Sequence, residues 1–262
     1  MIKRPAIRPP SSAGIGKILN TAKLTASPLE NASATGNSGA SKVAGDPESF
    51  ATDSWATIQK AVQNNNTSAY HVGDTKTVTI NGTDYTVRIA NKTTGEHCGD
   101  NDTAYSQTAC GFVVEFVDCV TRMQMRDTNT NAGGYPATNV YTYLNGDGFN
   151  KLPNDLKDVI KSTRVVSGHG SGDSSNFTSN DQKLYLLSLM EIYGSDLGDT
   201  SQSATRQLDY YSSQNVTTSS YAGAIKQNNG SNAYWWLRSA YSNYYDYFYG
   251  VSTNGSWSGN RS

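Results

Sequence analysis

The sequence predicts an α+β fold in which short helices surround small antiparallel sheets, preceded by a disordered N-terminal arm. Three observations carry this prediction. Residues 77–89 read as a β-hairpin, because two alternating segments flank the turn residues Asn81-Gly82. Residues 54–62 begin with a capping serine and then place apolar side chains on one helical face. Residues 1–45 are poor in large apolar groups, so they cannot form a core alone.

The segment 1–45 is also distinct in charge and composition. It holds six basic residues against one acidic residue, a balance of +5, whereas the whole chain carries a net charge of −1. Pro, Ser, Ala and Gly dominate it, as in linkers. Two interpretations stay open: a disordered tail, or a basic arm that becomes ordered when it docks on a larger assembly. We place the domain boundary at residue 46, with one folded domain over 46–262.

The sequence also argues against a signal peptide, a membrane-spanning segment and nucleic acid binding. No apolar segment follows the charged start Met1-Ile-Lys-Arg-Pro5, so we expect no signal peptide. No apolar run approaches the length that spans a bilayer, so we expect no membrane insertion. The net charge of −1 gives no case for nucleic acid binding.

Within 46–262 the sequence pattern predicts a series of short helices and strands separated by polar loops. Trp55, Ile58 and Val62 should be the buried face of the first helix, and the hairpin should pair Val78 with Tyr85. Further along, the pattern predicts a buried strand over 112–117, a short helix around Tyr141 and Leu144, a helix that starts at Pro153, and a strand running into a turn over 183–192. Residues 91–110, 167–181 and 195–232 are predicted to be polar loops.

Three cysteines lie within 22 residues, which leaves at least one unpaired. We predict a bridge between Cys98 and Cys110 across a polar loop, and a buried thiol at Cys119 after the apolar strand. His97 is interpreted as a loop residue, because no second ligand pair has zinc spacing. We therefore expect no metal and no cofactor.

The segment with the most information about function lies near the C-terminus. Six of the 17 tyrosines fall in the 16 residues from Tyr234 to Tyr249. Tyr offers a large, stiff and amphipathic contact, and Ser, Gly and Asn add adaptable hydrogen bonds, as in binding surfaces. The alternative is a Tyr-rich strand pair in the core, but six buried hydroxyl groups would all need partners. The composition therefore favours an exposed binding face.

The residues that follow alternate in character over 250–258. Small polar residues stand at the even positions, whereas Val251 and Trp257 stand at odd positions. Successive side chains of a strand point to opposite faces. We therefore predict one strand with a small polar face outward and Trp257 on the core side, and we expect Trp236 and Leu237 to be buried. Arg238 is interpreted as a structural hydrogen-bonding fork under the sheet.

The same segment resembles the variable proteins of diversity-generating retroelements, whose C-type-lectin-like domain ends in a region mutated at adenines. The even positions from Gly250 to Ser258 and most positions of 241–247 can be encoded by Asn codons altered only at their two adenines. The block Tyr234-Trp-Trp-Leu-Arg-Ser239 is similar to the framework that opens such regions. The resemblance implies a variable segment over 241–262 whose ligand-binding residues are Tyr241, Asn243, Tyr244, Tyr245, Asp246, Tyr247, Gly250, Ser252, Asn254, Ser256, Ser258 and Asn260.

Separated blocks over residues 50–262 also resemble an uncharacterised bacterial and phage domain family with a C-type-lectin-like fold. The shared blocks are 133–137, 143–145, 152–156, 183–188, 191–194 and 236–239. Such domains continue into a final core strand, whereas this chain stops at Ser262. Either the chain is trimmed or its last strand is missing, and the closing of the terminal sheet is in question.

The resemblance implies non-catalytic binding to a protein or glycan on a host cell surface, at a virion or a cell surface, by a phage receptor-binding or virion-displayed protein. The alternatives are a structural virion decoration protein and a bacterial surface adhesin, and an oligomer is compatible with each. A calcium loop is set aside: Asp127-Thr-Asn-Thr-Asn131 matches three positions, but Ala132 and Thr138 stand where Gly and Glu are required. We expect no catalytic residues.

Overall fold

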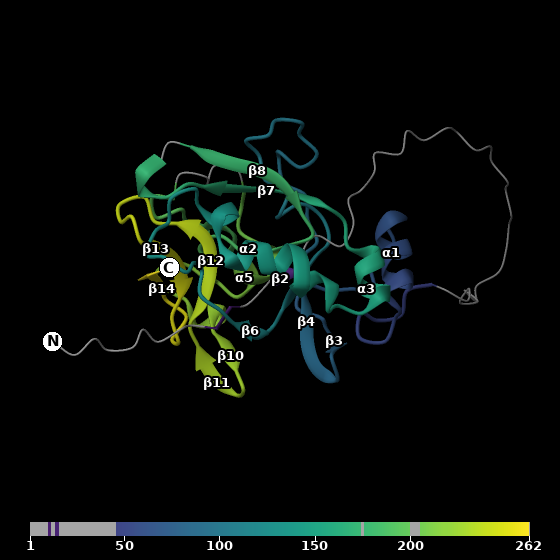
Figure 1. Cartoon of the computed structure of the whole chain (residues 1–262). Coiled ribbons are helices and arrows are strands. Elements are labelled where there is room, and N and C mark those ends of the chain that lie inside the picture. The colour runs from purple at the N-terminus through teal and green to yellow at the C-terminus, as the bar shows by residue number, and fades with distance from the viewer. Residues whose placement is uncertain (1–9, 12–13, 16–45, 174–175, 200–204, 262) are drawn as a thin grey trace, which may run out of the picture.

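The computed structural model describes residues 10–11, 14–15, 46–173, 176–199 and 205–261. Short helices and small antiparallel sheets pack around one core (Figure 1). This confirms the mixed helix-and-strand class with short helices and small sheets. Over the described ranges, no helix has both the length and the apolar character needed to cross a bilayer.

The first helix and the first hairpin form as predicted. Helix α1 (Trp55–Gln63) is capped by Ser54, whose hydroxyl accepts a hydrogen bond from the Thr57 amide at 3.1 Å. Strands β3 (Thr75–Ile80) and β4 (Thr83–Asn91) pair Val78 with Tyr85. Asn81 and Gly82 have φ values of 51° and 80°, the two left-handed residues that this turn requires.

A five-stranded sheet runs in the order β3-β4-β5-β2-β9. Strand β5 (Val113–Phe116) is buried throughout, as predicted, and β9 (Leu184–Tyr185) forms the far edge. Between them lies β2 (Gly14–Ile15), which belongs to the N-terminal segment. The nearby strand β1 (Pro10–Ser11) pairs with β6 (Thr121–Arg122). At these four N-terminal residues the expected lack of structure does not hold; the rest of 1–45 lies outside the described residues.

Short helices fill the middle of the chain. They are η1 (Tyr135–Ala137), α2 (Asn139–Tyr143), η2 (Leu144–Gly148) and α3 (Asn154–Val159). The helix predicted around Tyr141 and Leu144 is thereby confirmed. Pro153 stands at the N-cap of α3, one position before the first-turn site that was predicted.

The predicted loop over 167–181 is wrong. Strands β7 (Thr163–Gly168) and β8 (Phe177–Gln182) form a hairpin, with η3 (Ser171–Asp173) near its tip. Strand β8 is polar and mostly half-buried or exposed, so it lacks the apolar alternation by which strands are recognised. Its pairing with β7, whose Val165 and Val166 are buried, holds it in place.

Two further predictions need correction. The strand predicted to run into a turn over 183–192 is only the two residues of β9, and the expected turn is the helix α4 (Leu189–Tyr193), where Ser188 and Glu191 form a reciprocal capping box. The predicted loop over 195–232 contains α5 (Asp209–Ser213), η5 (Ala222–Ala224), and the hairpin of β10 (Lys226–Asn228) and β11 (Ser231–Ala233). This hairpin turns at Asn229-Gly230, the same signal that marked the first hairpin.

The C-terminal sheet has three strands in the order β12-β13-β14. They are β12 (Trp235–Ala240), β13 (Tyr247–Val251) and β14 (Trp257–Arg261), at the left of Figure 1. Trp236 and Leu237 are buried, as predicted. The continuous strand predicted over 250–258 is wrong, because the chain reverses between β13 and β14.

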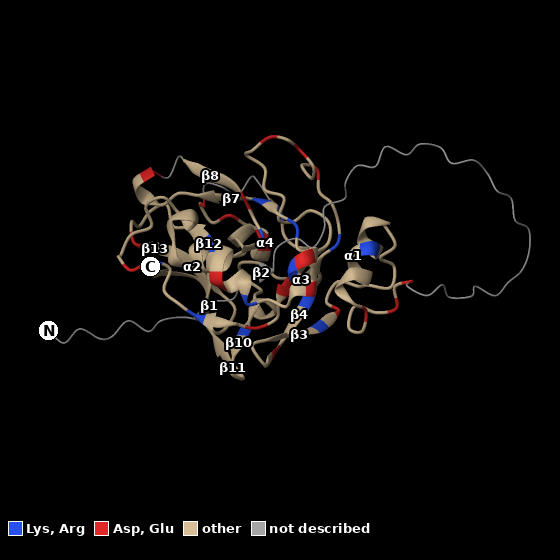
Figure 2. Cartoon of the chain, turned by 45° about the vertical axis from the view of Figure 1, so that its right-hand side comes forward, with Lys and Arg blue, Asp and Glu red and all other residues tan. Residues whose placement is uncertain are grey.

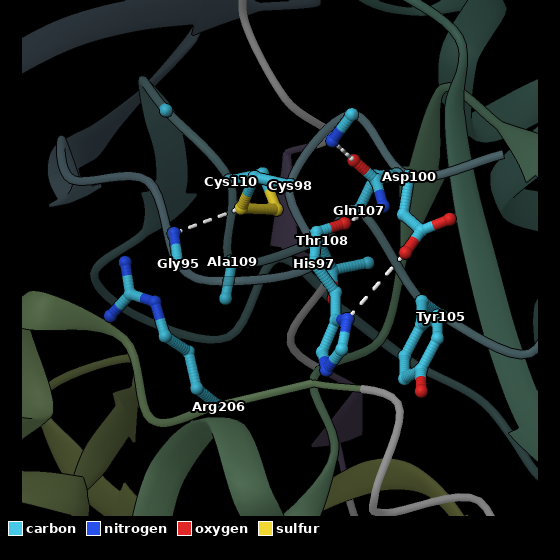
Figure 3. The surroundings of a disulfide bond; sticks show 12 residues. Gly95, His97, Cys98, Asp100, Tyr105, Gln107, Thr108, Ala109, Cys110 and Arg206 are labelled. Atoms are coloured by element: carbon cyan, nitrogen blue, oxygen red, sulfur yellow. Dashed lines mark hydrogen bonds and ion pairs between the residues drawn. A yellow bond between two sulfur atoms is a disulfide. The ribbon is translucent and has the colours of Figure 1, made fainter. Parts of the chain in front are cut away.

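The disulfide predicted between Cys98 and Cys110 is present, with Cα atoms 5.4 Å apart (Figure 3). His97 lies in a turn of this loop, as predicted, and stacks on Tyr105 at a centroid distance of 3.7 Å. Gln107 ties the loop together: its amide nitrogen donates to the His97 carbonyl at 2.9 Å. Cys119 is free and buried, and burial raises the pKa of its thiol to about 11.

Charged residues are sparse along the ribbon in Figure 2, and the side chains of several are buried. Buried Glu115 on β5 contacts three partners: Arg88 at 2.8 Å, Lys226 at 3.1 Å and the Tyr211 hydroxyl at 2.9 Å. Burial alone would raise the pKa of Glu115, but the charges of Arg88 and Lys226 hold it below its usual 4.5.

These contacts predict loss of stability in acid. A carboxylate whose folded pKa is depressed stabilises the fold above its unfolded pKa, and this contribution is lost as the pH falls through the folded pKa. For Glu115 the loss begins below about pH 4.5. Asp209 adds to it below about pH 3.8, because backbone and side-chain hydrogen bonds from Lys92 and Thr93 overcome the effect of burial on its pKa.

Urea unfolding between pH 7 and pH 2.5 measures this dependence. We expect a free energy of unfolding that falls steeply below pH 4.5, and a shallower fall at the acid end in Asp209→Asn. Equal stability at pH 7 and pH 3 would contradict the assignment of these ion pairs.

Candidate functional site

The Tyr-rich loop between β12 and β13 is held by one buried side chain, Asn131. Its amide nitrogen donates to the carbonyl oxygens of Tyr241, Tyr244 and Tyr247 at 2.8, 2.7 and 2.8 Å. Its backbone amide donates to the Tyr245 carbonyl at 2.6 Å. Asn131 is fully buried, so a residue about 110 positions away in sequence sets the backbone path of the loop.

The other side of Asn131 is fixed by the tip of the β7–β8 hairpin. Its side-chain oxygen accepts a hydrogen bond from the Ser171 amide at 3.1 Å. A Cβ on Gly170 would lie 1.9 Å from that oxygen, so only glycine fits at this position. The polar segment 127–131, which matches part of a calcium loop, therefore ends in an anchor that joins two loops.

Two more contacts hold the Tyr-rich loop at its ends. The Ser242 hydroxyl donates to the Gly198 carbonyl at 2.9 Å, and the Tyr249 hydroxyl donates to the Leu197 carbonyl at 2.9 Å. Burial raises the pKa of the Tyr249 hydroxyl, and nearby Tyr241 raises it further. The loop is thus attached to the segment that follows α4 as well as to Asn131.

Five aromatic rings form a connected cluster over this sheet, which we call the aromatic surface. Tyr241 stacks on Tyr249 at 4.6 Å and contacts Tyr244 at 5.3 Å and Tyr247 at 6.4 Å. Tyr244 contacts Tyr247 at 5.2 Å, and Tyr249 meets Trp257 edge-on at 6.2 Å. Such arrangements are the favourable ones for aromatic pairs.

The aromatic surface is partly open to solvent. Tyr244 is 56% exposed and Trp257 is 37% exposed, whereas Tyr249 is buried beneath. Tyr245, 66% exposed, projects from the same loop. A Cβ on Gly259 would lie 3.3 Å from the Tyr247 ring and 3.5 Å from the Tyr241 ring, so these rings lie over a strand position without a side chain. Large exposed aromatic groups in one place are typical of binding surfaces.

The predicted core-side position of Trp257 is wrong, because this side chain is 37% exposed. Residues opposite each other on β13 and β14 share a face, and Phe248 lies opposite Asn260 while Gly250 lies opposite Ser258. Ser258 and Asn260, both half-buried, therefore share a face with the buried residues Phe248 and Gly250. Trp257 lies opposite Val251 on the other face, with the aromatic surface.

The predicted site residues therefore fall into three groups. Tyr241, Asn243, Tyr244, Tyr245 and Tyr247 lie in or beside the loop and are half-buried or exposed. Ser252, Asn254 and Ser256 lie in the turn between β13 and β14, where Ser256 donates to the Asn254 side-chain oxygen at 2.8 Å and bonds the Ser252 hydroxyl at 2.7 Å. Asp246 and Gly250 are buried, and Ser258 and Asn260 lie on the opposite face, so the single exposed patch that was predicted is wrong for these four.

The sequence reasoning missed three residues of this site. Tyr249 was left out of the predicted site residues and Trp257 was placed on the core side, although both rings belong to the aromatic surface. The anchoring role of Asn131 could not be predicted from the sequence around it. Its partners are backbone carbonyl groups, which every residue has, so they leave no mark in the sequence.

Two other places were considered as sites. A cavity of about 280 Å³ beside the disulfide is lined by His97, Cys98 and Arg206. The Arg206 guanidinium, shown in Figure 3, already donates hydrogen bonds to Asp209, Asn91 and Thr93. We therefore interpret Arg206 as a structural residue rather than a ligand contact. Among the described residues, no group of three or more His, Cys, Asp or Glu side chains is placed to hold a metal ion.

His169 forms a second polar constellation. Its Nδ1 lies 2.5 Å from an Asp173 oxygen, and its Nε2 lies 2.8 Å from the Thr178 hydroxyl. Both ring nitrogens are thereby engaged in joining the two arms of the β7–β8 hairpin. We interpret this group as structural.

Comparison with protein families matches residues 113–262 to the family described as "Domain of unknown function (DUF6273)". The chain belongs to the DUF6273 family. The match covers the buried strand β5, Asn131, the β7–β8 hairpin and the whole C-terminal sheet, so anchor and aromatic surface both lie in the DUF6273 region. Searches of curated proteins and of solved structures gave no match.

Proposed function

We propose that this DUF6273 protein is a non-catalytic binding protein whose aromatic surface contacts a protein or glycan on a host cell surface. The observation that carries the proposal is the connected cluster of Tyr241, Tyr244, Tyr247, Tyr249 and Trp257, open to solvent at Tyr244 and Trp257. Aromatic side chains at such a surface supply most of the binding energy.

The way the loop is held supports a surface that tolerates sequence change. Asn131 contacts backbone atoms of 241, 244, 245 and 247, and these are present whatever side chains the loop carries. Side chains at 243, 244 and 245 are exposed, so they can change without altering the core. This separation of anchor and surface fits a diversified binding loop.

We further propose that the fold is C-type-lectin-like and that the protein is displayed on a virion, most simply as a phage receptor-binding protein. The short helices around small antiparallel sheets support the fold. The sequence blocks that resemble retroelement variable proteins, above all residues 234–239, support the display role.

The proposal predicts that Tyr244→Ala weakens binding by about 2 kcal/mol, as at other aromatic hot spots. Stability should change by no more than about 0.5 kcal/mol, since the ring is 56% exposed. Fluorescently labelled protein on a panel of bacterial strains and on a glycan array provides the readout. Tyr105→Ala, which removes a Tyr beside the disulfide, is the matched control and should leave binding unchanged.

A block exchange of Tyr241, Asn243, Tyr244, Tyr245 and Tyr247 for other Tyr, Asn, Ser and Asp combinations extends the test. Folded variants with altered strain or glycan preference would support a diversified surface. Folded variants that bind as before would place the binding site elsewhere. Variants that fail to fold would make the Tyr-rich loop structural, as in a virion decoration protein.

A further inference from the structure

Strand β2 lies inside the main sheet, between β5 and β9, at a position that no other described strand fills. Gly14 pairs with Glu115 of β5 on one side and with Tyr185 of β9 on the other, and Ile15 pairs with Leu184. Glu115, Tyr185 and Leu184 are each no more than 2% exposed. Backbone groups at this depth need partners from the protein, since water does not reach them.

The residues that fill this slot come from far away in the sequence. Gly14 lies about 100 positions before Glu115 and about 170 before Tyr185. A second contact precedes it, where Pro10 and Ser11 pair with Arg122 and Thr121 of β6. Residues 10–11 and residues 14–15 thus each meet the body through antiparallel strand pairing.

The covalent connection between this segment and the first helix is long. Thirty residues, 16–45, separate Ile15 from Asp46. A chain of that length spans at most about 100 Å when fully extended. A connection of this length would allow β2 to reach the same slot in a second copy of the chain as well as the slot in its own copy.

We propose that the slot between β5 and β9 is a strand-acceptor site, and that β2 (Gly14–Ile15) is an exchangeable donor strand that one copy of the chain supplies to another. Adding an extended segment to a sheet through main-chain hydrogen bonds is an established mode of peptide recognition. Exchange of such an element between identical chains links them without any new type of contact. The partner is a second copy of this chain, and the linkage does not depend on the aromatic surface.

The first test uses the full chain with Gly14→Pro. Proline lacks the N–H and the extended φ that a central strand needs, so the slot of this variant lacks its donor. A synthetic peptide of residues 6–20 should bind it with 1:1 stoichiometry in calorimetry. At a peptide concentration of about 100 times Kd, the Tm should rise by roughly 5–10 °C. The same peptide with Gly14→Pro is the control, and equal binding of both peptides would overturn the proposal.

A second test remains informative if that variant does not fold. A sequence-specific protease site is placed within residues 28–35 of the otherwise unchanged chain, and the connection is cut. The N-terminal fragment should remain with the body in size-exclusion chromatography, and labelled peptide 6–20 should replace it over time. A fragment that separates while the body melts at an unchanged temperature would overturn the acceptor site. A fragment that stays but never exchanges would overturn the exchange.

The link between copies is tested by refolding the uncut wild-type chain at increasing concentration. Light scattering should show dimers or larger species whose share grows with concentration, and Gly14→Pro should remain monomeric. Wild-type monomers at every concentration, or equal oligomers in both proteins, would overturn donation between copies.

Discussion

Arg238→Met should be among the most destabilising single substitutions in this protein, lowering the free energy of unfolding by about 3–5 kcal/mol. The Arg238 guanidinium, 1% exposed, donates to both carboxylate oxygens of Glu191 at 2.6 Å and to the Leu186 carbonyl at 2.8 Å. Methionine fills similar volume but leaves the Glu191 charge buried without its cation. The same carboxylate closes the capping box of α4, so the helix should weaken too.

Chemical denaturation of three variants separates the causes. Arg238→Lys keeps the charge but not the planar fork, so we expect an intermediate loss. Arg238→Met combined with Glu191→Gln removes both charges and should recover part of the loss seen in Arg238→Met alone. A cost below 1 kcal/mol for Arg238→Met would show that the buried pair is not what holds β12 to α4.

The ion pair of Arg238 and Glu191 also shows what could and could not be predicted from the sequence alone. The role of Arg238 as a structural hydrogen-bonding fork was predicted, and the structure confirms it. Its partner was not predicted, because Glu191 lies 47 residues earlier and only the tertiary fold brings them together.

Local signals were read correctly where one physical cause decided the conformation. Asn81-Gly82 fixed a turn through its left-handed φ values, and the Ser54 side chain fixed a helix start. Local signals failed where a polar segment became a strand only because a neighbouring strand pairs with it. Strand β8 is polar and was read as loop, although β7 pairs with it along its whole length.

The error over 250–258 has the same origin. Alternating small and large residues are compatible with one strand, but they are also compatible with two strands joined by a turn. The turn gave a signal at Asn254-Gly255, and Gly255 has a φ of 90° there. Trp257 still shares a face with Val251, as the alternation predicted, but it lies at the edge of the aromatic surface and is 37% exposed.

Asn131→Asp should both destabilise the protein and release the Tyr-rich loop. Aspartate has nearly the shape of asparagine, but it replaces the donating amide with an oxygen that faces the carbonyls of Tyr241, Tyr244 and Tyr247 at 2.7–2.8 Å. The carbonyls of Tyr241 and Tyr244 then lose the Asn131 donor, whereas the Tyr247 carbonyl keeps the Tyr241 amide at 3.0 Å. The new carboxylate itself is fully buried. With each buried unsatisfied group costing about 1–3 kcal/mol, we expect a total on the order of 3 kcal/mol or more.

Asn129→Asp is the matched control, since it makes the same change of charge two residues earlier at an exposed position. We expect it to alter stability by no more than about 0.5 kcal/mol. Hydrogen–deuterium exchange should show faster exchange over 241–247 in Asn131→Asp only, at temperatures where the rest of the sheet is still protected. The aromatic surface depends on that backbone path, so ligand binding should fall in Asn131→Asp even where the protein remains folded. If the two variants share the same stability and the same exchange pattern, Asn131 does not organise the loop.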